Sequence, residues 1–196
     1  MAAPARIRRS PDWDSLFEVA QGQDGYFTTA QAAQLGYSRP LLHKHLAGGK
    51  IVRARRGVYR VVHFPASDRE DLVVLWLWSE QAGVFSHDTA LALHDLSDAL
   101  PSKAHLTLPA AWGRRRLRVP AGLMLHFADI GERERTSFGA VPVTAPLRTL
   151  SDCIEADLAP GLLDQAIRQA RRRGLISAAD EARLRSQRSG RRPESR

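Results

Sequence analysis

Apolar residues recur with a helical period in three short stretches near the start of the chain, around Leu16–Ala20, at 29–35 and at 39–47. Each stretch follows a residue type that caps helices, and each ends beside a glycine. The capping candidates are Asp12 or Asp14, Thr28 or Thr29, and Ser38. The pattern therefore predicts three helices, with a short extended segment at 25–28 between the first two.

The period changes from helical to alternating in Gly48–Val62, which reads GGKIVRARRGVYRVV. Apolar residues alternate with arginines on both sides of an Arg56-Gly57 turn, which predicts a β-hairpin. Its inward-facing residues are expected to be Val52, Ala54, Tyr59 and Val61. Helix, strand, helix, turn, helix and hairpin is the order of a winged helix-turn-helix, in which the third helix is the recognition helix and the hairpin is the wing.

A second block follows a predicted joint at Pro65–Asp68. Its pattern predicts two helices within 67–83 and 84–101, the second capped by Ser86, then strands at 105–109, 122–127 and 138–144, and two final helices at 145–156 and 159–174. The predicted fold class is α+β, with a winged helix-turn-helix domain followed by a small mixed α/β domain. The predicted boundaries are a disordered basic tail at 1–10, the winged helix at 11–64, the α/β domain at 68–182 and a second disordered basic tail at 184–196.

The charge balance of the chain indicates a polyanionic partner. Its 196 residues carry a formal net charge of +8 at neutral pH, with a pI near 10.7. Nucleic acid is the first candidate and an acidic membrane surface the second. Of the 29 basic residues, 26 are arginine, which suits contacts with phosphate and guanine, but a GC-rich genome explains the same bias equally well.

Much of this charge is concentrated on the predicted recognition helix and wing. Residues 25–67 contain seven basic residues and no acidic one, whereas a solvated surface usually mixes both signs. The recognition helix is expected to reach the major groove, and the wing to touch phosphates or enter the minor groove. The predicted DNA-binding residues are Thr28, Thr29, Ser38, Arg39, His43, Lys44, Lys50, Arg53, Arg55 and Arg56. If about five of them meet phosphates, the affinity falls with salt at a log–log slope of about −4 to −5.

Two further basic faces lie in the second block. One comprises Arg114, Arg115, Arg116 and Arg118, and the other comprises Arg168, Arg171, Arg172 and Arg173. The second set has two interpretations of equal weight. It is either a solvated helix end, where cations suit the helix dipole, or a secondary contact face for nucleic acid or a protein partner.

The sequence gives little support for catalysis, a metal or a cofactor. His87 and His94 lie seven residues apart on one helix, about 10.5 Å along its axis, so one ion cannot bind both. His105 and His126 are expected to be edge or core residues, and no set of clustered carboxylates resembles a nuclease site. The single cysteine, Cys153, fits a reducing cytoplasm, and neither a signal peptide nor an apolar segment long enough to span a bilayer is predicted.

The segment GYFTTAQAAQLGYSRPLLHKHLAGGKIVRARRGVYRV resembles the N-terminal winged-helix domain of AbiEi-family antitoxins from type IV toxin–antitoxin systems. The second block continues the resemblance through FSHDTALALHDL, HLTLP and VPVTAPLRTLSDC. The resemblance implies a DNA-binding protein that represses its own operon from inverted repeats upstream. It also implies that the C-terminal domain neutralises a co-encoded nucleotidyltransferase-like toxin, directly or indirectly.

Three functional interpretations remain open on sequence grounds. The first is the antitoxin and autorepressor, acting without catalysis and monomeric in solution, since no heptad repeat or long exposed apolar helix indicates a dimer. The second is a winged-helix regulator with a sensing C-terminal domain and no toxin. The third is a nucleic-acid-processing enzyme that uses the winged helix for targeting.

Overall fold

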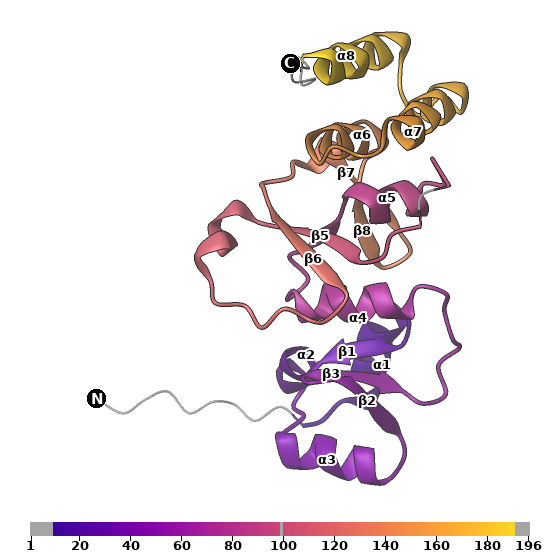
Figure 1. The fold of residues 1–196 in the computed structure, drawn as a ribbon. Coiled ribbons are helices and arrows are strands. Elements are labelled where there is room, and N and C mark those ends of the chain that lie inside the picture. The colour runs from indigo at the N-terminus through magenta and orange to yellow at the C-terminus, as the bar shows by residue number, and fades with distance from the viewer. Residues whose placement is uncertain (1–9, 99, 191–196) are drawn as a thin grey trace. The chain divides into compact units, whose positions relative to one another are not determined.

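The computed structural model describes residues 10–98 and 100–190, and the chain divides into two compact units between Gln81 and Ala82 (Figure 1). The fold is α+β, with a three-stranded sheet in the first unit and a five-stranded sheet in the second. None of the helices in the described ranges combines the length and the apolar character that a membrane span requires.

The N-terminal unit follows the element order of a winged helix-turn-helix (Figure 1). Its three strands form an antiparallel sheet in the order β1-β3-β2. The elements in chain order are α1 (Trp13–Gln21), β1 (Tyr26–Thr28), α2 (Thr29–Gln34), α3 (Arg39–Ala47), β2 (Ile51–Arg55), β3 (Val58–Val61) and α4 (Glu70–Trp78).

The three predicted helix starts are confirmed, each by a side-chain cap. Asp12, rather than Asp14, accepts a hydrogen bond from the Ser15 backbone N–H at the start of α1. Thr28 caps α2 in a reciprocal capping box with Gln31, and Ser38 caps α3. These bonds satisfy amide groups that a helix start leaves without intrahelical partners.

The hairpin forms as predicted, and its second strand faces as expected, with Val61 buried and Tyr59 packed against the core. Its first strand differs, because Ile51 is buried whereas Val52, expected to face inward, has an exposed fraction of 45%. The pairing register slips at Ala54, because Arg53 pairs with Tyr59 and Arg55 pairs with Val58. A bulge of this kind places two residues opposite one, so simple alternation does not give the facing of the strand.

Helix α4 belongs to the N-terminal unit, which corrects the predicted joint at Pro65–Asp68. Glu70, in its first turn, accepts a hydrogen bond of 3.0 Å from the Tyr26 hydroxyl and pairs with Arg60 at 3.1 Å. The boundary therefore lies after Gln81, because these bonds join the start of α4 to strands β1 and β3.

The C-terminal unit is built on a mixed sheet in the order β6-β5-β4-β8-β7. Strand β4 runs antiparallel to β5 and parallel to β8, β5 and β6 are parallel, and β7 and β8 form an antiparallel hairpin. The strands are β4 (Val84–Phe85), β5 (Ala104–Leu108), β6 (Leu123–Phe127), β7 (Arg135–Phe138) and β8 (Val141–Thr144). The single strand predicted at 138–144 is thus the turn and second strand of this hairpin.

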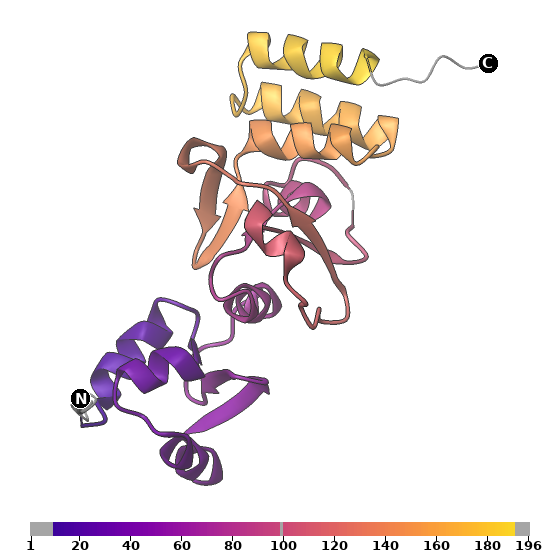
Figure 2. The same ribbon diagram turned by 90° about the vertical axis from the view of Figure 1, so that its left-hand side faces the viewer.

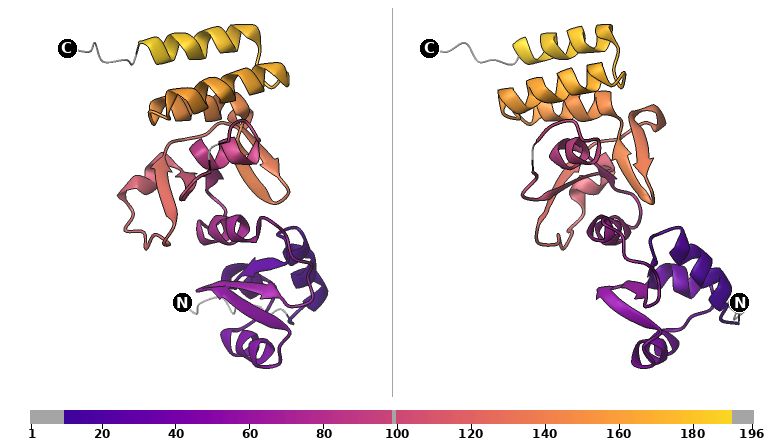
Figure 3. Two further views of the ribbon diagram at one scale, coloured as in Figure 1. Left: turned by 45° about the vertical axis from the view of Figure 1, so that its right-hand side comes forward. Right: turned by 90° about the vertical axis from the view of Figure 1, so that its right-hand side faces the viewer.

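The helices of this unit stack in layers on the sheet. They are α5 (His87–Leu93), α6 (Pro146–Glu155), α7 (Pro160–Arg172) and α8 (Ala178–Ser189), with two short 3₁₀ turns at Ala110–Arg114 and Glu132–Glu134. Figures 2 and 3 show α6, α7 and α8 one above another. Their shared core contains Leu91, Leu150, Ile154, Ile167 and Leu184.

Helix α8 corrects the expectation of a disordered tail from residue 184 onward. Residues 184–189 are helical, and Leu184 is 1% exposed. Ser177 and Asp180 form a capping box at the start of this helix. The rest of that tail, at 191–196, and residues 1–9 of the N-terminal tail lie outside the described residues.

Candidate nucleic-acid interface

Five basic side chains are exposed on the segment formed by α3 and the following hairpin. They are Arg39, Lys44, Lys50, Arg53 and Arg56. Ser38 and His43 of the predicted set are also exposed, while Arg55 is half-buried. Figure 1 shows the hairpin beginning soon after the end of α3. The predicted basic residues thus lie on α3, on the hairpin and at the turn positions beside its strands, a segment that carries no acidic residue.

The inner side of α3 is held by apolar and aromatic contacts. Leu42 is 2% exposed, and His45 lies between the rings of Trp13 and Tyr37, with centroids 5.4 and 5.7 Å away. Burial lowers the pKa of His45, and the neighbouring positive charges of Lys50 and Lys44 lower it further. His45 is therefore a neutral packing residue, and this packing fixes the outer side of α3 in solvent.

The hairpin turn is anchored to α2. Thr29 donates two hydrogen bonds to the Gly57 carbonyl, from its backbone N–H at 2.9 Å and from its hydroxyl at 3.3 Å. Gly57 adopts a φ of +82°, a conformation that residues with a Cβ rarely adopt. Thr28 and Thr29, predicted as DNA-binding residues, thus have internal roles in capping and in holding the wing.

Tyr59 packs inside the unit, where its ring stacks on Phe27 with centroids 5.8 Å apart. Arg60 is also withdrawn from the basic face. It pairs with Glu70 and donates a 2.8 Å hydrogen bond to the Phe64 carbonyl, and its side chain is 17% exposed. Burial and the hydrogen bond to Glu70 raise the pKa of Tyr26 to about 12.

The two C-terminal basic faces differ in how far internal contacts occupy them. Arg173 donates to the carbonyls of His94 and Asp95, at 2.6 and 2.9 Å, at the end of α5. Arg172 bonds to Gln169, and Arg171 lies 3.9 Å from Glu181. Arg168 is exposed on the same helix.

The loop face is more open. Arg114, Arg116 and Arg118 are exposed, and the Arg115 guanidinium lies 3.8 Å from the centroid of the Trp112 ring.

The segment from α1 to the end of the hairpin has a recognisable family. Residues 14–62 match the AbiEi antitoxin family of transcriptional regulators. This match confirms the AbiEi resemblance inferred from the N-terminal segment, and it covers α3 and the β2–β3 hairpin.

No curated protein sequence matches the chain significantly. Among solved structures, the crystal structure of RV2827C protein from Mycobacterium tuberculosis resembles it at a TM-score of 0.43 and 14% identity, covering 100% of this chain and 87% of that one. A likeness this distant carries no functional assignment.

Outside the AbiEi segment, the structure brings together three histidines that sequence reasoning treated separately. His105 lies on β5, His126 on β6, and His87 begins α5 directly after β4. Their ring nitrogens offer one atom each within 4.8 Å of one another. His94, which the sequence paired with His87, instead contacts the Thr144 carbonyl through Nε2 at 2.8 Å.

Burial governs the charge state of the three clustered rings. It lowers the pKa of His87 to about 3, with smaller contributions from His126, His105 and Arg148. It also lowers the pKa of His105 and of His126, and the carboxylate of Asp88 opposes this shift at both. The three rings are therefore neutral, and a neutral imidazole can bind a ligand through its unprotonated nitrogen.

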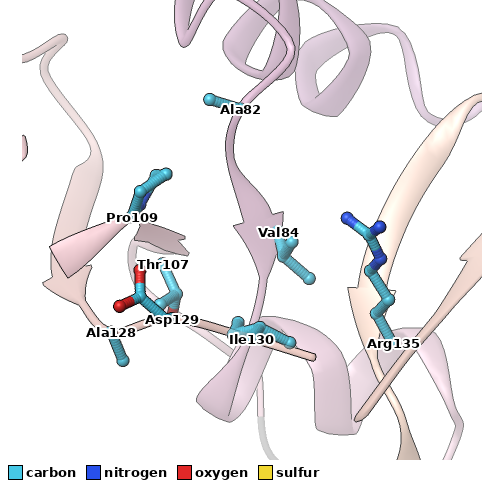
Figure 4. A pocket seen from close by; sticks show the side chains of 8 residues that line it. All are labelled: Ala82, Val84, Thr107, Pro109, Ala128, Asp129, Ile130 and Arg135. Atoms are coloured by element: carbon cyan, nitrogen blue, oxygen red, sulfur yellow. The ribbon is translucent and has the colours of Figure 1, made fainter. Parts of the chain in front are cut away.

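A small pocket of about 160 Å³ lies in the same unit (Figure 4). Asp129 and Arg135 lie on opposite sides of it, with Val84 and Ile130 between them. The Asp129 carboxylate already accepts a 3.1 Å hydrogen bond from the Ala110 N–H, and Arg135 lies 3.9 Å from Glu132. Pockets that hold cofactors are usually about 300–1,000 Å³, so this one is small for such a ligand.

The P-L-R-T-L-x-D segment, quoted for the resemblance, forms an ion-pair network in α6. Arg148 donates to Asp152 at 2.7 Å and to Glu134 at 2.9 Å, which links α6 to the turn before β7. Thr149 donates to the Thr144 carbonyl at 3.0 Å. These contacts join α6 to the β7–β8 hairpin and its approach, which is a structural role for the motif.

Proposed function

We propose that this chain is a DNA-binding antitoxin of a type IV toxin–antitoxin system. Its N-terminal winged helix represses its own operon by binding inverted repeats upstream, and its C-terminal unit neutralises a co-encoded nucleotidyltransferase-like toxin. It acts in the cytoplasm as a monomer in solution, by binding rather than by catalysis.

The single observation that carries the proposal is the one-signed charge of α3 and the hairpin. Five exposed basic residues lie there, no acidic residue lies between 25 and 67, and the same segment matches a family of transcriptional regulators. Cations that neutralise DNA phosphates release condensed counterions, which supplies affinity without sequence preference. Preference must then come from side chains that reach base edges.

The exposed residues divide between these two tasks. Arg39, His43 and Lys44 lie on α3, the helix that a winged helix places in the major groove, where arginine and lysine recognise guanine. Arg53 and Arg56 lie on the hairpin and its turn, where they suit phosphates or the minor groove. Lys50, between the two elements, has its Nζ 5.8 Å from the Trp13 ring centroid and suits a phosphate.

The antitoxin activity is assigned to the C-terminal unit because the AbiEi match occupies the other unit. The exposed loop arginines at 114, 116 and 118 are the better candidates for contact with a partner. Arg171, Arg172 and Arg173 already bind neighbouring groups within the unit, so a partner would have to displace those contacts.

Two measurements in one host test the proposal. A reporter under the chain's own upstream region should be repressed by the full chain and released by Arg39→Ala with Lys44→Ala. In cells that express the neighbouring nucleotidyltransferase-like toxin gene, co-expression of the full chain should restore growth. The variant with Arg39→Ala and Lys44→Ala should restore growth as well. Repression without a toxin to neutralise would support a plain regulator, and failure of both activities would refute the proposal.

A further inference from the structure

The three clustered histidines lie on, or just after, three neighbouring strands of one sheet. Parallel strands β5 and β6 pair His105 with Met124 and Thr107 with His126, so both rings lie on the same face, one diagonal step apart. His87 follows β4, which pairs with β5 on its other side. Folding of the sheet therefore creates the cluster, and the spacing of 18 and 21 residues along the chain gives no sign of it.

Two of the nitrogens already lie at the separation that a metal ion imposes. His126 Nε2 is 3.1 Å from His105 Nδ1. Zinc binds histidine nitrogen at about 2.0–2.1 Å in tetrahedral geometry, which places two ligand nitrogens about 3.3 Å apart. All three ligand atoms lie within 4.8 Å of one another, so closing on one ion needs the widest separation to shorten by up to about 1.5 Å.

The contacts of His87 suit a metal ligand. Its Nδ1 lies 2.9 Å from the Ser86 hydroxyl, which in turn accepts a 2.7 Å hydrogen bond from Thr107. Metal-binding histidines usually donate their second ring N–H to such a partner, which fixes the ring and leaves the other nitrogen for the ion. Nε2 of His87 is then the nitrogen available to an ion.

The backbone at His87 is held in an uncommon conformation. Its φ is +51°, in the left-handed region, at the first residue of a helix. Strain of this kind concentrates at functional sites. The ring is stacked on His126 with centroids 3.6 Å apart, and it must tilt out of this stack to direct a lone pair at a shared ion.

From this geometry we infer that His87, His105 and His126 form a binding site for one Zn²⁺-like divalent transition-metal ion in the C-terminal unit. Three imidazoles suit zinc, cobalt, nickel or copper rather than magnesium or calcium, which prefer oxygen ligands. Three protein nitrogens leave a fourth position of a tetrahedral ion for water or for a ligand from outside. The ion would link the start of α5 to strands β5 and β6. This proposal differs from the expectation, drawn from the sequence, that the chain binds no metal.

The test is a titration of tag-free, metal-stripped full chain with Co²⁺, followed by competition with Zn²⁺. The visible d–d bands of Co²⁺ report its coordination, and calorimetry reports the number of ions bound. We expect one ion per chain and a rise in the unfolding temperature when Zn²⁺ is present, because a ligand that binds only the folded state stabilises it. Ser86→Ala removes a hydrogen-bond partner of the ligand His87 and should weaken metal binding by roughly 10–100-fold. His126→Gln removes a ligand itself and should weaken binding by more than that.

A matched control, His63→Gln, removes one exposed imidazole of the N-terminal unit. This variant should bind Zn²⁺ as tightly as the wild type. Circular dichroism without metal checks that His126→Gln folds, and His105→Gln provides a second test if it does not. The proposal fails if the wild type binds no Co²⁺, which would leave only a hydrogen-bonded stack of rings, or if folded His126→Gln and His105→Gln bind as tightly as the wild type.

Discussion

The salt dependence of DNA binding gives the sharpest test of the wing. Arg53 and Arg56 are both exposed, and removing their side chains by Arg53→Ala with Arg56→Ala leaves the buried contacts of the hairpin intact. Surface substitutions of this kind change stability by about 0.5 kcal/mol or less, so the variant should stay folded.

The expected magnitude follows from the two wing arginines that the variant removes. Each phosphate contact contributes about −0.9 to the log–log slope of affinity against salt, so the slope of the variant should be shallower than that of the wild type by about 1.8. At about 0.15 M salt, the two lost contacts amount to about 2 kcal/mol, or about a 30-fold loss in affinity.

The assay is fluorescence anisotropy with one labelled duplex, repeated across a salt series for both proteins. Arg133→Ala with Arg183→Ala is the matched control, because both arginines are exposed in the C-terminal unit and belong to none of the predicted contact faces. The control should keep the wild-type slope. An unchanged slope in folded Arg53→Ala/Arg56→Ala protein would refute the assignment of the wing to DNA.

Three further predictions concern stability, measured by denaturant or thermal unfolding. Glu70→Gln should cost about 1–3 kcal/mol, because the largely buried Arg60 loses its charged partner, and an unchanged midpoint would contradict the role given to this pair. Gly25→Ala should lower the free energy of unfolding by about 1–3 kcal/mol more than Gly49→Ala. Both glycines have positive φ, but only at Gly25 would a Cβ lie within 2.5 Å of another side chain. Equal losses in the two variants would contradict this reasoning and show that the packing relaxes. Burial lowers the pKa of His94 below its ordinary 6.5, so the unfolded state binds the proton more readily and stability should fall as the pH drops below about 6.5. His94→Gln should reduce this acid sensitivity, and an identical pH profile would contradict it.

The first three helices could be predicted from the sequence because local contacts determine where they begin. The caps of α1, α2 and α3 are short side chains bonded within three residues, so their signals lie in the sequence itself. The hairpin turn could be predicted for the same reason. The facing of the side chains on its first strand could not, because the bulge at Ala54 depends on how the two strands pair.

Helices α8 and α4 were predicted wrongly for two different reasons. Helix α8 buries Leu184 alone, so its apolar period is too weak to predict a helix, although the Ser177 and Asp180 capping box was a readable signal. Helix α4 was assigned to the wrong block because its position depends on bonds to Tyr26 and Arg60, which are distant in the sequence.

The histidine cluster could not have been found by spacing. His87 and His94 share a helix and look like a pair in the sequence, yet they bond to Ser86 and to Thr144 respectively. His105 and His126 meet through the parallel pairing of β5 and β6, which only the sheet order determines.

The central claim, that the N-terminal unit is a sequence-specific repressor, is tested most directly by binding of the purified chain to its own upstream DNA and to a scrambled duplex of equal length across a salt series. Specific regulators bind their sites about 10³–10⁷-fold more tightly than other DNA at physiological salt. The account predicts a preference for the upstream duplex that persists there. Equal affinities for both duplexes, falling steeply together with salt, would contradict it.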